Sequence, residues 1–201
     1  MSNFIKNYIE ESFRILEEVN KDDIQSVIDQ VKITKDSGGR IFFVGVGGGA
    51  AHASHAVNDF RKIANIESYC LTDNVYELTA RVNDDSWDTS YVDSIMINKL
   101  KINDLIFVFS VGGGDEEKNI SNNIVNLLKY VKDNTQARIV GIVGPNGGYT
   151  KKVANACITV PAKIVITPHT EGMQSIFSHL IVSHPDIMYY NTKWENELKE
   201  K

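Results

Sequence analysis

A histidine and an aspartate, placed four residues apart just after a run of glycines, are the side chains of this chain best suited to do chemistry. His55 and Asp59 follow the glycines of Gly45–Gly49. Residues at i and i+4 lie on one face of a helix, so a helix over residues 50–64 brings the imidazole and the carboxylate together. Such a pair either transfers protons or binds a divalent metal. A plain surface ion pair has the same spacing, so the surrounding residues must decide.

The glycine run indicates a turn that binds an anion or a sugar. Ile41–Val44 is an apolar run typical of a buried strand, and four of the next five residues are glycine. A strand, a glycine turn and a helix start together present free helix N–H groups to a ligand. The turn also overlaps a relaxed dinucleotide-binding pattern, with Asp73 near the place of its acidic residue. Two further glycine loops, Val111–Asp115 and Gly144–Gly148, favour instead a ligand held from several strand ends.

The rest of the chain alternates continuous apolar runs with segments of helical periodicity, which predicts an α/β fold with a five-stranded parallel sheet flanked by helices in three layers. We expect strands at Arg40–Val44, Ser68–Leu71, Asp104–Ser110, Arg138–Val143 and Ala156–Val160, and helices at 3–19, 22–38, 50–64, 74–100 with a break near 83–85, after Asp115, and from Pro168 to about Tyr190. We also expect Asp115 to cap the helix that follows it. All three glycine loops then lie at the carboxyl ends of strands, where such sheets bind their ligands.

Length and composition favour one globular domain over residues 1–201, in which the helical pair 1–38 serves packing or oligomerisation and 39–201 forms the sheet core and the last helix. The chain has 201 residues, 42% of them hydrophobic and 23% charged, and a net charge of −5. The acidic balance argues against nucleic acid as a partner. No apolar stretch approaches the length of a membrane helix, and the first residues lack a signal peptide's apolar core. Cys70 and Cys157 have no metal-type spacing, so we expect reduced thiols and a cytoplasmic protein.

Several segments combine into a pattern specific enough to suggest a family. Gly45 to His55 reads Gly-Val-Gly-Gly-Gly-Ala-Ala-His-Ala-Ser-His, close to Gly-Asn-Gly-Gly-Ser-Ala-Ala-x-Ala-x-His. Further matches are Leu71–Asn74, Leu78–Ala80, Asn83-Asp84 and the turn Gly144–Gly148. On these residues the chain resembles the sugar isomerase (SIS) domain family, and within it the bacterial phosphoheptose isomerases. The resemblance covers most of the chain, from the paired N-terminal helices to the last helix.

The resemblance implies an aldose–ketose isomerase that converts sedoheptulose 7-phosphate to an aldoheptose 7-phosphate through an enediol, for the heptose of surface polysaccharides. It implies Asp59, where the family has glutamate, as base and His179 as acid. It also implies a zinc ion held by His55, Asp59, Glu171 and His179, and a homotetramer with sites between subunits. Glu171 and His179 are eight residues apart, or about 12 Å along a straight helix. We therefore expect Glu171 in an irregular first turn, or one ligand from a neighbouring subunit.

The expected substrate-binding residues are Gly47, Gly48, Gly49, Asp84, Ser110, Gly112, Gly113 and Asp115. Two of the loops depart from the family. Where its isomerases read Ser-Thr-Ser-Gly-Asn-Ser, this chain reads Ser110-Val111-Gly112-Gly113-Gly114-Asp115, and Gly49 replaces a serine. Glycine N–H groups still offer an anion site, but a carboxylate beside a phosphate would repel it. Two alternatives stay open: an isomerase of a non-phosphorylated or altered sugar, and a non-catalytic SIS module that binds a sugar ligand or a protein such as a replication initiator.

Overall fold

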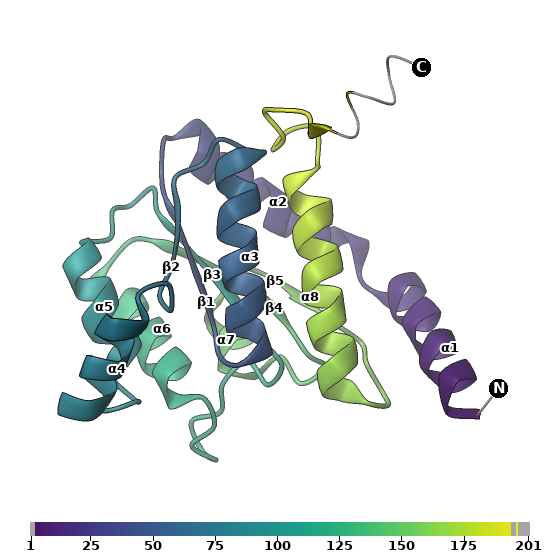
Figure 1. The fold of residues 1–201 in the computed structure, drawn as a ribbon, viewed down its shortest axis with the longest axis horizontal. Coiled ribbons are helices and arrows are strands. Elements are labelled where there is room, and N and C mark those ends of the chain that lie inside the picture. Colours follow the sequence, from purple (N-terminus) through teal and green to yellow (C-terminus); the bar gives the residue numbers. More distant parts are fainter. Residues whose placement is uncertain (1–2, 194–195, 197–201) are drawn as a thin grey trace.

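The fold is taken from a computed structural model, which describes residues 3–193 and 196 (Figure 1). In chain order its elements are α1 (Asn3–Glu18), α2 (Lys21–Asp36), β1 (Ile41–Gly45), α3 (Gly48–Lys62), β2 (Ser68–Cys70), α4 (Val75–Asp84), α5 (Ser90–Asn98), β3 (Leu105–Ser110), α6 (Asn122–Asn134), β4 (Arg138–Val143), α7 (Gly148–Val153), β5 (Ala156–Thr159) and α8 (Ile166–Val182). Within the described residues, no helix combines the length and apolar character needed to cross a membrane.

The five strands form one parallel sheet in the order β2-β1-β3-β4-β5, which confirms the predicted fold class. Every residue of β1 and β3 is buried, because helices cover both faces of the sheet. This explains why these strands read as unbroken apolar runs instead of alternating ones. The strand order reverses between β1 and β3, so the loops that follow these two strands flank the crevice where such sheets bind ligands.

Two separate clusters of apolar side chains hold the helices on the sheet. One lies between the sheet and α2, α3 and α8, and the other lies between the opposite face and α5, α6 and α7. Figure 1 shows α3 and α8 side by side over the same face of the sheet, while α1 extends outward beyond α8. The two helices that carry the expected reactive residues therefore share one core and one neighbour.

Helix α3 is fixed on the sheet by an aromatic cluster. The Phe60 ring packs edge-on against Phe43 of β1, with ring centroids 5.0 Å apart, and against Phe107 of β3, at 6.3 Å. All three side chains are fully buried. Truncating such a phenylalanine to alanine costs about 3–5 kcal/mol of folding free energy. The rotation of α3 about its own axis is thus set by the core and not by the polar residues on its outer side.

The last helix is shorter than the sequence predicted. It ends at Val182, where Ser183 takes the C-cap position, instead of continuing to about Tyr190. Pro185 explains the early end, since proline has no N–H group for the helix and disfavours helical backbone at the preceding residue, His184. The chain beyond Val182 forms a turn, and Ile187 in this segment is fully buried.

The prediction that Asp115 caps the next helix was wrong. Helix α6 begins seven residues later, at Asn122, with Ser121 in the N-cap position. The Oδ1 atom of Asp115 instead accepts hydrogen bonds from the N–H groups of Glu117 and Lys118, each 3.0 Å away, which closes a local turn. The backbone hydrogen bond from Lys118 contributes most to holding the pKa of Asp115 below its ordinary value. An aspartate closes such a turn as readily as it caps a helix, so the residue type alone could not show which of the two Asp115 does.

Helix α1 is anchored by one buried carboxylate. Glu11 is 7% exposed. Its Oε1 accepts hydrogen bonds from the Arg14 guanidinium at 2.7 Å and from the Lys163 N–H at 2.6 Å. Arg14 also donates to the carbonyl of Pro161 at 2.6 Å. These bonds join α1 to the connection between β5 and α8. The Arg14 hydrogen bond is the largest of the effects that lower the pKa of Glu11 from 4.5 to about 2.

Replacing Glu11 is expected to make the fold less stable at neutral pH, by an amount that becomes smaller in acid. A carboxyl group whose folded pKa is lowered from 4.5 to about 2 stabilises the fold above pH 4.5, and this contribution disappears as the pH falls toward 2. Glu11→Gln should lower the free energy of unfolding by about 1–3 kcal/mol at pH 7. Urea unfolding at pH 7 and at pH 3 measures the difference, with Glu17→Gln as an exposed control. An equal deficit at both pH values would contradict the assignment.

Candidate active site

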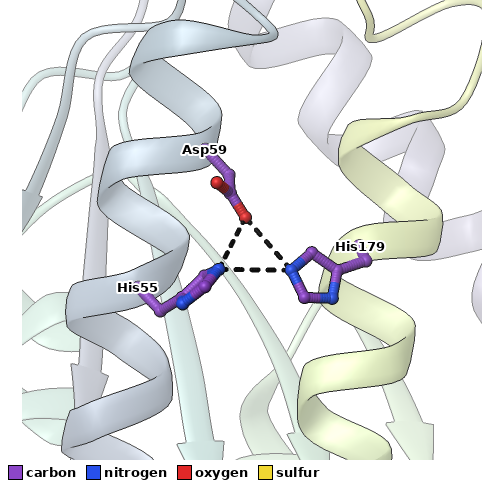
Figure 2. Close-up of side chains that lie close together, drawn as sticks. All are labelled: His55, Asp59 and His179. Carbon is purple, nitrogen blue, oxygen red and sulfur yellow. Dashed lines mark hydrogen bonds and ion pairs between the residues drawn. The ribbon is translucent and has the colours of Figure 1, made fainter. Parts of the chain in front are cut away.

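Three side chains from two helices meet between α3 and α8 (Figure 2). His55 and Asp59 come from α3, and His179 comes from α8. The Oδ2 atom of Asp59 lies 3.1 Å from Nε2 of His55 and 3.3 Å from Nε2 of His179. The two Nε2 atoms are 3.2 Å apart. The structure thus joins three of the four residues that the resemblance assigned to one site.

The helical phase of α3 explains this arrangement. Ala53, Ala56 and Phe60 face the sheet and are buried, so His55 and Asp59 lie on the side turned toward α8. The imidazole of His55 is 60% exposed and that of His179 is 50% exposed, whereas the Asp59 side chain is only 11% exposed. The carboxylate therefore sits at the bottom of the group, and both imidazoles border the solvent.

Asn58 is a residue of this site that the sequence did not reveal. Its side-chain amide donates a hydrogen bond of 3.1 Å to Oδ1 of Asp59, the oxygen that faces away from the two histidines. Both oxygens of the carboxylate are thereby held, which fixes its orientation. A polar residue next to a reactive one is common in any sequence, and no spacing rule distinguishes Asn58 from its neighbours.

The three donor atoms match one face of a metal coordination tetrahedron. Ligands about 2.1 Å from a zinc ion in tetrahedral geometry are ~3.4 Å from one another. The three separations here, 3.1, 3.2 and 3.3 Å, are close to that value. Two imidazole nitrogens and one carboxylate oxygen also form a donor set that zinc accepts. The residues present therefore fit a divalent metal.

Glu171 lies outside this group of donor atoms. It stands a turn and a half into α8, so the expectation of an irregular first turn is not met. Its carboxylate lies against Gly48: a Cβ atom at that position would be 2.4 Å from Cδ of Glu171. Gly47, the residue before Gly48, has a φ of +58°, which residues with a side chain rarely adopt. The glycine turn thus makes room for Glu171.

His52 interacts electrostatically with Glu171, His55 and His179. It lies one helical turn after Gly48 and three residues before His55, and its side chain is half-buried. Burial is the main cause that lowers the pKa of His52 below its ordinary value. The charge of Glu171 opposes this effect, while His55 and His179 add to it. These interactions place His52 in the same electrostatic environment as the reactive group.

The second glycine loop is closed by its own hydrogen bonds. The Ser110 hydroxyl accepts a bond of 3.0 Å from the Gly113 N–H. The Gly113 carbonyl accepts from both the N–H and the hydroxyl of Thr150, at 2.8 and 2.7 Å. Within the described residues, the N–H groups of Gly112 and Gly114 make no hydrogen bond. The loop therefore offers backbone donors to a ligand, and the oxygen of the expected serine hydroxyl already accepts one hydrogen bond.

The remaining expected binding residues are distributed around the sheet edge. Gly47 is the N-cap of α3 and Gly49 lies in the first turn of that helix. The Tyr91 hydroxyl of α5 fixes the start of the turn by donating to the Gly45 carbonyl at 2.6 Å. Asp84 is the last residue of α4 and is exposed. Its carboxylate accepts from the Asn83 amide at 2.8 Å. Within the described residues, no hydrogen bond or ion pair joins the Asp84 side chain to α3 or α8.

Comparison with known proteins supplies a family and several relatives. A family model described as the SIS domain matches residues 7–144. A phosphoheptose isomerase from Aneurinibacillus thermoaerophilus is 25% identical over 96% of this chain and 98% of its own. A probable phosphoheptose isomerase from Thermoplasma acidophilum is 26% identical over 90% of this chain and 97% of its own. The solved phosphoheptose isomerase GmhA from Neisseria gonorrhoeae superposes with a TM-score of 0.77 at 18% identity, over 89% of this chain and 95% of its own, which supports the same fold.

The fit of the donor triangle to a metal predicts binding that depends on all three residues. The purified protein, stripped with a chelator and titrated with zinc, should bind about one ion per chain. His55→Ala, Asp59→Asn and His179→Ala should each weaken binding on the order of 100-fold or more, because each removes a ligand. Isothermal titration calorimetry measures the affinity, and His184→Ala is the control. Wild-type affinity in all three variants would refute the site.

Proposed function

The chain belongs to the SIS domain family, and from this premise we propose that it is an aldose–ketose isomerase that converts sedoheptulose 7-phosphate, or a closely related sugar, to an aldoheptose 7-phosphate. The single observation that carries the proposal is the convergence of His55, Asp59 and His179 on one point. Relatives named phosphoheptose isomerase that align with nearly the whole chain support the reaction class. An acid and a base within hydrogen-bond reach are what a proton transfer between neighbouring carbons requires.

In this mechanism Asp59 and His179 divide the proton transfers. Asp59 takes a proton from C1 of the ketose while the His179 imidazolium gives one to the carbonyl oxygen on C2, which yields a neutral enediol. His179 then takes the proton of the C1 hydroxyl, and Asp59 returns its proton to C2, which leaves an aldehyde at C1. Protons and electrons balance over the two steps. Asn58 keeps the Asp59 carboxylate in place throughout.

The donor triangle would hold a divalent metal, which we propose to be zinc, through His55, Asp59 and His179. Bound there, the metal would polarise the substrate carbonyl, the task that the His179 proton performs in its absence. Glu171 is a further ligand only by the resemblance, since its carboxylate stands apart from the other three. A carboxylate has two oxygens, so Asp59 could bind the metal through Oδ2 while Oδ1, which accepts one hydrogen bond from Asn58, keeps a second lone pair for the proton.

The phosphate end of the substrate is assigned to the loop after β3. Backbone N–H groups of consecutive residues can form a concave anion site without hydroxyl side chains. The N–H groups of Gly112 and Gly114 make no hydrogen bond within the described chain, which supports this role. The Asp115 carboxylate is engaged by Lys118, whose ammonium lies 3.2 Å from it, so part of its charge is offset.

The altered loops also support one alternative, a SIS module that binds a sugar or a protein without catalysis. Ser110 is the only hydroxyl residue at the six positions from Ser110 to Asp115. Weaker binding of a phosphate group would suit a ligand other than the family's substrate. The retained acid–base group favours the enzyme, because a binding module has no need of it. A pull-down with the replication initiator at micromolar protein tests the protein-binding form of this alternative.

We further propose a homotetramer whose sites lie between subunits. Helix α1 buries only Glu11 and Ile15 in the chain itself. Its exposed apolar residues include Phe4 and Phe13, which are 62% and 64% exposed. An exposed apolar helix face of this kind is typical of a surface that a second copy covers. The exposed imidazoles of His55 and His179 would then be shielded from solvent by assembly.

We also propose a cellular location and a pathway for the protein. A cytoplasmic location is supported by the two unpaired cysteines: Cys70 is buried, and burial raises the pKa of the half-buried Cys157 thiol to about 12. The aldoheptose phosphate would supply heptose for a surface polysaccharide. No nucleic acid or membrane partner is needed for this role.

The direct test incubates the purified protein with sedoheptulose 7-phosphate, with and without added zinc, and detects an aldoheptose 7-phosphate by chromatography. We expect turnover that falls at least about 100-fold in Asp59→Asn and in His179→Ala, since each loses a proton-transfer group. His184→Ala is the matched control, and thermal unfolding confirms that the variants fold. Full activity in both site variants would contradict the mechanism, and no turnover by folded, metal-loaded wild type would refute the substrate.

A further inference from the structure

One buried hydroxyl bonds to the backbone where the first glycine turn begins. The Tyr91 side chain of α5 is 1% exposed, and its hydroxyl donates a hydrogen bond of 2.6 Å to the carbonyl of Gly45, the last residue of β1. Burial raises the pKa of Tyr91 above its ordinary value, so the hydroxyl keeps its proton and remains a donor. The ring is held by the apolar cluster under α5 and α6 and by Trp87, with ring centroids 5.9 Å apart.

This hydroxyl takes the place of a strand partner that β2 does not supply. The Phe43 carbonyl of β1 accepts a hydrogen bond of 3.3 Å from the Leu71 N–H group, which follows β2. Alternate residues of a strand point their carbonyls to the same side, so the Gly45 carbonyl also points toward β2. In this register its donor would be Asp73. The chain turns there, and the Asp73 N–H group donates instead to the Cys70 carbonyl, at 3.2 Å.

The turn after Gly45 carries three N–H groups that are available to a ligand. Gly47 has φ and ψ of 58° and −123°, and the Gly49 N–H group donates to the Val46 carbonyl at 3.1 Å, as in a type II′ turn. Within the described residues, the N–H groups of Val46, Gly47 and Gly48 donate no hydrogen bond. A trans peptide bond is planar, so its N–H and C=O groups point in opposite directions. Because the Gly45 carbonyl points toward β2, the Val46 N–H group points toward β3, where the strand order reverses.

We propose that Tyr91 is a positioning residue, whose hydroxyl fixes the peptide between Gly45 and Val46 so that the N–H groups of the glycine turn face the substrate. This proposal deepens the proposed isomerase function and rests on it. Without the hydroxyl, the buried Gly45 carbonyl loses the donor that replaces a strand partner. A buried carbonyl without a donor is costly, so the peptide would rotate toward another donor and turn the Val46 N–H group away from β3.

The position of Tyr91 separates this role from the proton-transfer group. Tyr91 belongs to the apolar cluster between the sheet and α5, α6 and α7, whereas α3 and α8 pack on the other face. The hydroxyl therefore acts on the backbone of the turn and not on His55, Asp59 or His179. Substrate binding should depend on this hydroxyl, and metal binding should not.

The first test observes the peptide itself. Tyr91→Phe removes one oxygen atom and keeps the ring. The amide nitrogen of a residue responds to hydrogen bonding at the preceding carbonyl, so NMR of protein labelled with 15N-valine should show a larger shift for Val46 than for the other valines. Val46→Ile assigns that signal by its loss. Tyr130→Phe is the matched control, because Tyr130 packs against the same cluster and its hydroxyl makes no hydrogen bond within the described part of the chain.

Steady-state kinetics with sedoheptulose 7-phosphate provides the second readout. In Tyr91→Phe, KM should rise about tenfold, as expected for the loss of one hydrogen bond to substrate. A residue that only orients a binding group should leave kcat within about threefold of wild type. The affinity for zinc should also stay within about threefold, and thermal unfolding confirms that the variant folds. Tyr130→Phe should behave as wild type in every measurement.

Three results would overturn the positioning role. An unmoved Val46 signal, or an unchanged KM, in folded Tyr91→Phe would do so and leave the isomerase intact. Losses of similar size in zinc affinity and in KM would also do so, because a general loosening of the fold would then explain both. A wild type that does not turn over the substrate would refute the proposed function, and this role with it.

Discussion

The packing of Phe60 between β1 and β3 is the contact on which the geometry of the site depends. Because that ring is fully buried, α3 has only one rotation available, and His55 and Asp59 must face α8. Helix α8 is held in the same way, with Met173, Phe177 and Ile181 in the same apolar cluster. Two helices fixed by one core bring reactive atoms from residues 124 positions apart to within 3.2 Å. The core supplies this precision, while the exposed imidazoles themselves contribute little to stability.

The residues around the three-residue group differ in how firmly the protein itself orients them. Asp59 is buried and held at both oxygens, so its orientation does not depend on a ligand. His52 and Glu171 are half-buried, and neither makes a hydrogen bond or ion pair within the described part of the chain. The glycine turn joins the two regions, since a side chain at Gly48 would displace the Glu171 carboxylate. The third region, the loop after β3, is ordered by its own backbone bonds and offers N–H groups instead of hydroxyls.

The sequence predicted the fold and the reactive pair because both follow from local periodicity. Buried parallel strands read as apolar runs, and His55 and Asp59 lie within one helical turn, so neither needed tertiary information. The position of His179 came from the resemblance alone. Contacts between distant segments could not be predicted from the sequence, because no local pattern indicates that Glu171 lies against Gly48 or that the Tyr91 hydroxyl donates to the Gly45 carbonyl. The end of α8 was missed although Pro185 signalled it, because the apolar pattern continues past the proline.

The measurement that tests the account most directly is hydrogen exchange at the reacting carbons. Substrate is incubated with the enzyme in deuterium oxide, and proton NMR follows the label in the substrate and the aldose. If Asp59 carries a proton between C1 and C2 and exchanges it with the solvent before returning it, deuterium should enter at C2 of the product, and Asp59→Asn should abolish the exchange. Undiminished exchange in Asp59→Asn, from protein that folds as wild type does, would contradict the claim that the α3–α8 group is the reaction centre.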